Sequence, residues 1–214
     1  MSRDDHPYYL QQIGIDIWKT RSPIQPSSTI LLAELTKRVS SCTRCPLHQS
    51  RTQTVFSRGN PHAKLMIIGE APGFHEDKQG QPFVGKAGGL LNRMLISIQL
   101  TENDVYIANV LKCRPPDNRD PNIEEIEQCS EYLVQQIKAV QPKLIFAVGR
   151  FAAQSLLKQP SLTLTNMRGK VHRYLETPVI VSYHPAYLLR NPNDKKKAYQ
   201  DLLFLKKTLS QNID

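Results

Sequence analysis

The apolar residues of this chain gather into four short, uninterrupted runs that are separated by longer stretches of mixed polarity. These runs cover 65–68, 105–108, 144–148 and 179–181. Each run is too short for a helix, and none alternates with polar residues, which is typical of strands buried on both faces. The pattern therefore predicts an α/β fold, in which helices cover both faces of a parallel sheet.

The stretches between these runs carry apolar residues at the three- and four-residue spacing of amphipathic helices. Three of the predicted helices cover 86–98, 150–157 and 194–209. Another helix is expected to follow Asn122 as its N-cap, with Glu125 three residues later as its capping-box partner. An earlier helix, with Ser28 as its expected N-cap, leads the chain to Cys42.

The N-terminal residues differ from the rest of the chain. Residues 21–28 contain two prolines and three serines, which break regular structure and are typical of a linker. We therefore predict an N-terminal extension and linker over 1–28 and a folded domain over 29–214.

All four cysteines have positions that are typical of a metal centre. Cys42 and Cys45 form a Cys-x2-Cys pair, while Cys113 and Cys129 stand far along the chain and must be brought there by the fold. Two disulfides and four buried thiols are the alternatives. No apolar run follows Met1, so we expect no signal peptide, a cytoplasmic location and a reducing environment that disfavours disulfides. The spacing does not distinguish zinc from an iron–sulfur cluster.

The charge of the chain indicates a class of partner. It carries 28 Lys and Arg against 19 Asp and Glu, a formal charge of +9. This excess is compatible with a polyanion such as nucleic acid, although many basic proteins bind none. No apolar stretch approaches the roughly 20 residues of a membrane span, so we expect no membrane partner.

Three polar clusters follow the predicted strands, where parallel sheets bind their ligands. They cover 69–85, 109–116 and 182–190. Asn109 could present an amide donor and a carbonyl acceptor to a nucleobase, and His184 could donate to a developing anion. Taken singly, the first cluster could be an ordinary turn, Asn109 a local cap and His184 a structural hydrogen-bonding residue.

The clusters also contain recognisable motifs. They are Gly-Glu-Ala-Pro-Gly-x-x-Glu-Asp at 69–77, Pro-Phe-Val-Gly at 82–85, Asn-Val-Leu-Lys-Cys-Arg-Pro-Pro at 109–116 and His-Pro-Ala-Tyr-Leu-Leu-Arg at 184–190. With these motifs the chain resembles the family 4 uracil-DNA glycosylases from about Cys42 to its C-terminus. The resemblance implies a three-layer α/β/α sandwich around a four-stranded parallel sheet. It also implies a [4Fe–4S] cluster on the four cysteines.

The same resemblance implies a DNA-repair enzyme that flips deoxyuridine out of DNA and hydrolyses its N-glycosidic bond. In that family Phe83 would stack on uracil and Asn109 would read its Watson–Crick edge. Glu70, Ala71 and Pro72 would line the pocket. The implied substrate is uracil-containing DNA, single- or double-stranded, and we expect a monomer.

Catalytic roles follow from the resemblance as well. His184 would donate toward uracil O2, where negative charge develops when the bond breaks. Glu76 would crowd the C5 side, where thymine carries a methyl group. Better-known members of the superfamily carry an Asp beside the attacking water, where this chain has Ala71. Glu70 is the neighbouring candidate for activating that water, and the sequence does not settle which group does so.

The 184–190 loop is expected to fill the gap left by the flipped base. Leu188 and Leu189 are the apolar candidates for insertion, and Arg190 could contact phosphate.

Two other functions stay open at this point. One is a superfamily member with altered base specificity or a stable adduct with the abasic sugar. Adduct-forming relatives carry an extra histidine-containing loop, which 114–121 lacks. The other is a non-catalytic, iron–sulfur, nucleic-acid-binding module.

Overall fold

The computed structural model describes Gly14 and residues 27–211 of the chain. The predicted extension over 1–28 therefore lies outside the described residues except for Gly14 and residues 27–28. Among the residues described, no helix has both the length and the hydropathy that a membrane span requires.

Helices separate most of the strands along the described part of the chain. In sequence the elements are α2 (Ser28–Ser40), α3 (Leu47–Ser50), β1 (Arg58–Gly59), β2 (Leu65–Gly69), α4 (Phe74–Gln79), α5 (Lys86–Ser97), η2 (Glu102–Asp104), β3 (Val105–Asn109), η3 (Pro116–Asn118), α6 (Ile123–Val140), β4 (Leu144–Val148), α7 (Arg150–Leu157), α8 (Leu164–Met167), β5 (Val171–Tyr174), β6 (Thr177–Ser182), α9 (Pro185–Arg190), η4 (Pro192–Asp194) and α10 (Lys195–Gln211).

The four predicted strands form the parallel centre of the sheet, in the order β3-β2-β4-β6. The prediction of a four-stranded parallel sheet is nevertheless wrong, because β1 and β5 extend it to six strands with an antiparallel strand at each edge. The sequence pattern missed them because β1 has only two residues, while β5 has two polar residues at its centre and no buried residue. Short or polar edge strands lack the apolar run that marks a buried one.

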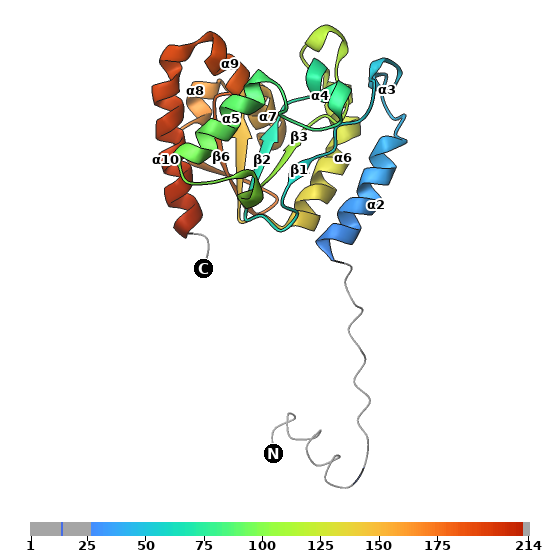
Figure 1. Ribbon diagram of the computed structural model, residues 1–214, viewed down its shortest axis with the longest axis horizontal. Helices are drawn as coiled ribbons and strands as arrows, with labels where there is room; N and C mark the ends of the chain where they lie inside the picture. Colours follow the sequence, from blue (N-terminus) through green and yellow to red (C-terminus); the bar gives the residue numbers. More distant parts are fainter. Residues whose placement is uncertain (1–13, 15–26, 212–214) are drawn as a thin grey trace.

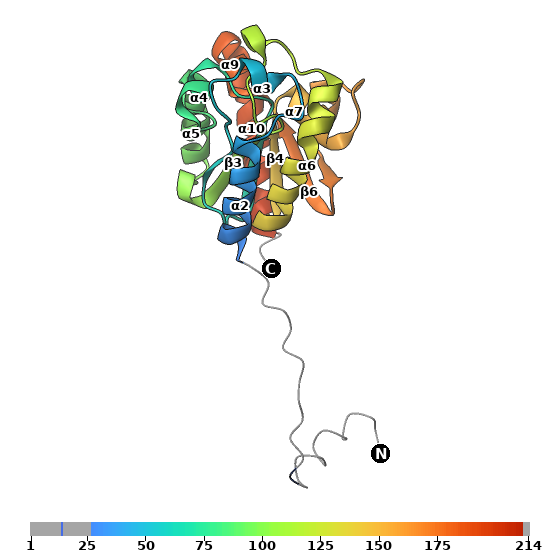
Figure 2. The same cartoon turned by 90° about the vertical axis from the view of Figure 1, so that its right-hand side faces the viewer.

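Helices cover both faces of the sheet, as the continuous apolar strands predict. One core cluster joins α2, α6 and α7 to one face, and the other joins α5, α9 and α10 to the opposite face. Figure 1 shows α10 and α5 on one side of the strands and α6 and α2 on the other, and Figure 2 looks onto α2 and α6.

The boundaries of the predicted helices agree closely with the structure, whereas the short helices α3, α4, α8 and α9 were not predicted. Asn122 is the N-cap of α6, and its backbone N–H donates to the Glu125 carboxylate at 2.9 Å, as the capping box predicts. The first helix differs by one residue, because Ser27 takes the N-cap position and Ser28 is already helical. The four parallel strands all end at the edge of the sheet where α4 and α9 lie (Figure 1).

Candidate functional site

A cavity of about 910 Å³ opens beyond the carboxyl ends of the parallel strands. Segments that follow β2, β3, β4 and β6 all contribute to its wall. Of the residues singled out from the sequence, those that line it are Glu70, Ala71, Pro72, Glu76, Phe83, His184 and Arg190. The fold therefore brings together side chains that are separated by more than 100 positions in the sequence.

Glu76 organises the loop after β2. Its carboxylate accepts hydrogen bonds from the backbone N–H groups of Gly73, at 2.5 Å, and of Phe83. Burial raises the pKa of Glu76, and these two hydrogen bonds oppose that rise. Phe83 has a left-handed backbone with φ of 57°, which is strained for an aromatic residue. The carboxylate of Glu76 thus holds the loop in the conformation that places the Phe83 ring.

The Phe83 ring and the Asn109 amide converge on Gly69, the last residue of β2. A Cβ at Gly69 would lie 2.4 Å from Asn109 Oδ1 and 2.7 Å from Phe83 Cζ. Since both contacts are far shorter than van der Waals distances, only glycine permits this approach. The close packing sets an aromatic ring beside a polar amide at the end of the sheet.

Asn109 is buried at the end of β3, with only 2% of its surface exposed. Its backbone carbonyl accepts from Lys112 Nζ at 2.6 Å. Its side-chain Nδ2 is buried and has no hydrogen-bond partner among the described residues. An unpaired buried donor is costly, and Asn109 lies behind Gly69 and Phe83 and is not itself among the residues that line the cavity.

His184 precedes α9, and its tautomer follows from its contacts. Its Nδ1 accepts from the backbone N–H of Ala186 at 3.1 Å, so in the neutral ring Nε2 carries the hydrogen. Burial of the ring, and to a smaller extent the positive charge of Arg190, lowers the pKa of His184 to about 4. The ring centroid lies 5.6 Å from that of Phe83. At neutral pH the cavity thus contains an uncharged imidazole with an N–H to donate.

Glu70 follows β2 directly and has an unusual acidity. Burial and the nearby charge of Asp120 raise the pKa of Glu70 to about 7, while Arg150 opposes the rise. A carboxyl group poised near neutral pH is suited to proton transfer. Ala71, beside it, carries no group that could exchange a proton.

The predicted 184–190 loop is mostly helical, because Pro185–Arg190 forms α9, and this helix does not present all of the predicted DNA contacts at the surface. Leu188 is only 1% exposed and packs into the core with α5 and α10. Leu189 is 40% exposed, and Arg190 is exposed at the rim of the cavity. Of the two leucines, Leu189 alone has the access that an inserted side chain needs.

The four cysteines line one small pocket between α2, α3 and α6. All are free thiols; Cys113 and Cys129 are buried, and Cys42 and Cys45 are half-buried. The disulfide alternative therefore has no support. Burial raises the pKa of three of these thiols, to about 11 for Cys129, so their thiolates need a cationic partner.

Cationic side chains surround this cysteine pocket. Arg51 donates to Cys113 Sγ at 3.0 Å and to the Cys42 carbonyl at 2.9 Å. Lys112 is also part of the pocket wall. The donor set of four thiols suits a thiophilic metal centre. Within residues 27–211, however, no three His, Cys, Asp or Glu side chains are arranged to hold a single metal ion.

Sequence reasoning missed several residues of the main cavity. Arg150 stands two positions after the end of β4, and the same rule that drew attention to the other strand ends would have found it. Tyr183 and Tyr187 also line the cavity, with their rings stacked at 5.4 Å. They lie within the 182–190 cluster but carry no pattern that separates them from core aromatic residues.

Comparisons with known proteins agree with this geometry. The model of the uracil DNA glycosylase superfamily matches residues 56–204. A type-4 uracil-DNA glycosylase of Archaeoglobus fulgidus is 45% identical over 177 residues, covering 79% of this chain and 89% of the relative. One of Sulfurisphaera tokodaii is 46% identical over 178 residues, covering 79% and 81%. A type-5 enzyme of Pyrobaculum aerophilum is 30% identical over 190 residues, covering 72% and 82%.

Proposed function

Because this chain belongs to the uracil-DNA glycosylase superfamily and matches its type-4 members, we propose that it excises uracil from DNA by hydrolysing the N-glycosidic bond. The products are free uracil and an abasic site. The observation that carries this proposal is the unpartnered, buried Asn109 amide beside the Phe83 ring. An aromatic ring lies next to an amide that offers a donor and an acceptor side by side. This arrangement matches the shape and polarity of a flipped pyrimidine.

Each side chain has a distinct task in this proposal. Phe83 stacks on the base, while Asn109 Nδ2 donates to uracil O4 and Oδ1 accepts from N3–H. His184 Nε2–H donates to O2, where negative charge appears as the bond to the sugar breaks. A neutral imidazole is suited to this task because it donates without protonating the leaving group. Glu76 holds Phe83 in place. In the same proposal, Glu76 also lies beside C5 of the base, where thymine carries a methyl group.

Release of free uracil from defined oligonucleotides tests the activity. Single-stranded, U·G and U·A substrates are compared with an otherwise identical strand that carries thymine at the target position. Uracil release with no thymine release is expected. A protein that binds these strands but releases no base would be a nucleic-acid-binding module instead.

We propose further that Glu70 assists the attacking water as a base. Because its pKa is about 7, the single-turnover rate should rise as the pH increases through 7 and level off above it. Glu70→Gln is expected to lower the rate at pH 8 about 10-fold or more and to flatten the profile. Asp120→Asn is the matched control, because losing that charge should move the rise to lower pH while keeping the plateau.

The pKa of Glu70 also predicts a stability effect with a definite sign. A carboxyl group whose pKa is higher in the folded protein binds more protons there, so its contribution to stability falls as the pH rises toward 7. Glu70→Gln should therefore unfold at a higher temperature than the parent at pH 8, and this gain should shrink at pH 5. If Glu70→Gln and the parent unfold at the same temperature as each other at pH 8 and again at pH 5, the raised pKa of Glu70 is contradicted.

The four cysteines are proposed to hold a [4Fe–4S] cluster. Support comes from their shared pocket, their free thiols and the cationic groups around them. A single zinc ion would require all four sulfurs at about 2.3 Å from one point, a closer arrangement than a cluster needs. Hydrolysis requires no electron transfer, so the proposed role of the cluster is structural. It would hold together the segment between α2 and α3, the segment after β3 and α6.

Metal content tests this assignment. Protein purified without oxygen should be brown, with broad visible absorbance and about four irons per chain. Cys129→Ser should lose the colour, whereas Ser130→Ala at the neighbouring helix position should keep it. A colourless, folded parent with one stoichiometric zinc would show that the cluster assignment is wrong.

A further inference from the structure

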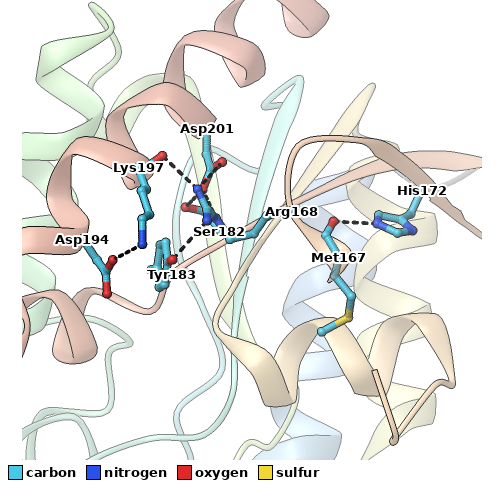
Figure 3. Close-up of polar contacts among 8 residues, drawn as sticks. All are labelled: Met167, Arg168, His172, Ser182, Tyr183, Asp194, Lys197 and Asp201. Carbon is cyan, nitrogen blue, oxygen red and sulfur yellow. Dashed lines mark hydrogen bonds and ion pairs between the residues drawn. The ribbon is translucent and has the colours of Figure 1, made fainter. Parts of the chain in front are cut away.

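A buried polar network connects the end of β6 to α10 and to the segment after α8 (Figure 3). Asp201 of α10 is 4% exposed, and its carboxylate accepts from Arg168 Nε at 2.7 Å and Nη2 at 3.0 Å. The same carboxylate accepts from Ser182 Oγ at 2.6 Å. Arg168 Nη1 donates to the Tyr183 hydroxyl at 3.0 Å. The two residues that immediately precede His184 are thus both fixed by one ion pair.

The arginine in this network is itself held in place. Its Nη2 also donates to the Lys197 carbonyl at 3.1 Å, and its Cζ lies 4.3 Å from the centroid of the Tyr183 ring. The residue before it, Met167, accepts from His172 Nε2 at 2.7 Å, which ties the segment to β5 (Figure 3). The guanidinium is therefore held on several sides and has little freedom to move.

Tyr183 transmits this order to the first turn of α9. Its ring stacks on Tyr187 with centroids 5.4 Å apart and an angle of 10° between planes. The Tyr187 hydroxyl donates to Asp194 at 2.8 Å, and Lys197 Nζ bonds the same carboxylate at 2.8 Å. His184 lies between the two stacked tyrosines in sequence. Tyr183, directly before His184, is consequently held by Arg168, and Tyr187, three positions after it, is held by Asp194 of η4.

Stability by itself does not account for a buried ion pair at this position. Removing two charges from water costs about as much as their attraction returns, and apolar residues of similar volume often stabilise a core more. A fully satisfied pair does restrict geometry, however, because each hydrogen bond has a preferred direction. Besides the bond to the Lys197 carbonyl, the Arg168–Asp201 pair makes hydrogen bonds to Ser182 and Tyr183, the two residues ahead of His184.

We propose that Arg168 and Asp201 are positioning residues that hold His184 Nε2–H where charge develops on the leaving base. The inference rests on the proposed uracil excision. Neither residue touches the base; they act through Ser182 and Tyr183. Because a misplacement of about 1 Å far from the reacting atoms can cost about 100-fold in rate, a loosened network should slow the chemical step.

Tyr183→Phe removes only one hydroxyl and leaves the ion pair in place, so it is the most conservative test. We expect its single-turnover rate at saturating enzyme to fall about 10-fold, with the affinity for uracil-containing DNA unchanged. Tyr106→Phe is a matched control. Tyr106 is also buried, and its hydroxyl accepts from Gln136 Nε2 at the same 3.0 Å, but it lies on β3 away from His184. The control should cleave at the parent rate, and a parental rate in Tyr183→Phe would overturn the proposal.

A double-mutant cycle tests whether the network acts through His184. In a His184→Ala background, Tyr183→Phe should cause no further loss of rate, because the group that the hydroxyl positions is already gone. An additional 10-fold loss in that background would overturn the proposal, since it would show an action independent of His184. Unfolding temperatures of all variants identify a temperature at which each is folded, and the rates are compared there.

A readout that needs no activity separates this proposal from the proposed function. NMR spectra of protein labelled with ¹⁵N-histidine report the environment of each imidazole. The signal that is missing in His184→Ala is that of His184. That signal should shift in Tyr183→Phe and stay in place in Tyr106→Phe. An unmoved His184 signal would overturn the positioning role even if uracil release is confirmed. A shifted signal in a protein that releases no uracil would instead locate the failure in the proposed function.

Discussion

Replacing His184 with alanine is expected to slow single-turnover release of uracil by about 100- to 1000-fold, the usual cost of losing one donor to a developing anion. The affinity for the same DNA should hardly change, because the hydrogen bond to O2 strengthens mainly in the transition state. The structure strengthens this expectation, since Nδ1 is occupied by the Ala186 N–H and leaves Nε2–H as the group to donate. The measurement is the cleavage rate at saturating enzyme, with binding measured separately.

Two controls separate the roles of chemistry and of binding. Lys196→Ala, on the exposed side of α10, should weaken DNA binding and reduce its salt dependence, with little effect on the chemical step. His62→Ala removes an exposed histidine and should change neither quantity. A His184→Ala defect that disappears at saturating enzyme would make His184 a DNA-binding residue, and the catalytic assignment would then be abandoned.

Asn109→Asp is expected to reduce uracil excision by about 5- to 150-fold, corresponding to about 1–3 kcal/mol for a lost or mispaired polar contact. An ionised carboxylate has no hydrogen to donate to uracil O4, but it accepts from the exocyclic amine of cytosine. The ratio of cytosine to uracil excision should therefore rise. Rates on matched strands that differ only in the target base measure both effects.

Asn109→Ala is the companion to this substitution. It removes donor and acceptor together, so it should lose uracil excision without gaining any on cytosine. The visible absorbance expected of the proposed cluster, together with the unfolding temperature, checks in both variants that the segment leading to Cys113 keeps its fold. Parental uracil kinetics in Asn109→Asp would remove this residue from the recognition of the base.

Much of the fold could be predicted from local patterns. The four parallel strands are continuous apolar runs because both their faces are buried, and that burial leaves a direct trace in the sequence. The capping box of α6 is equally local, since Asn122 and Glu125 are one helical turn apart. By contrast, β1 and β5 were missed because an edge strand has only one strand neighbour and need not be apolar.

The candidate site was found in outline for a related reason. Parallel strands end at one edge of the sheet, so the residues just after them converge whatever the details of packing. Glu70, Phe83 and His184 accordingly line one cavity. Exposure within α9 depends on which side of the helix packs against the core, and that helix was not predicted from the sequence. Leu188 and Leu189 are adjacent and chemically alike, yet one is buried against α5 and α10 and the other is exposed.

By itself the sequence determined the four parallel strands, the longer helices between them, the segments after the strands that carry polar groups and a cysteine spacing typical of a metal centre. These features depend on residue type and on short spacings along the chain. Only the tertiary structure decided the neutral state of His184, the pKa near 7 of Glu70 and the unpaired amide of Asn109. It alone placed Arg168 and Asp201, 33 positions apart, around the residues that precede His184. The physical reason is that burial, electrostatic fields and hydrogen-bond partners are set by groups distant in the chain, which no local pattern records.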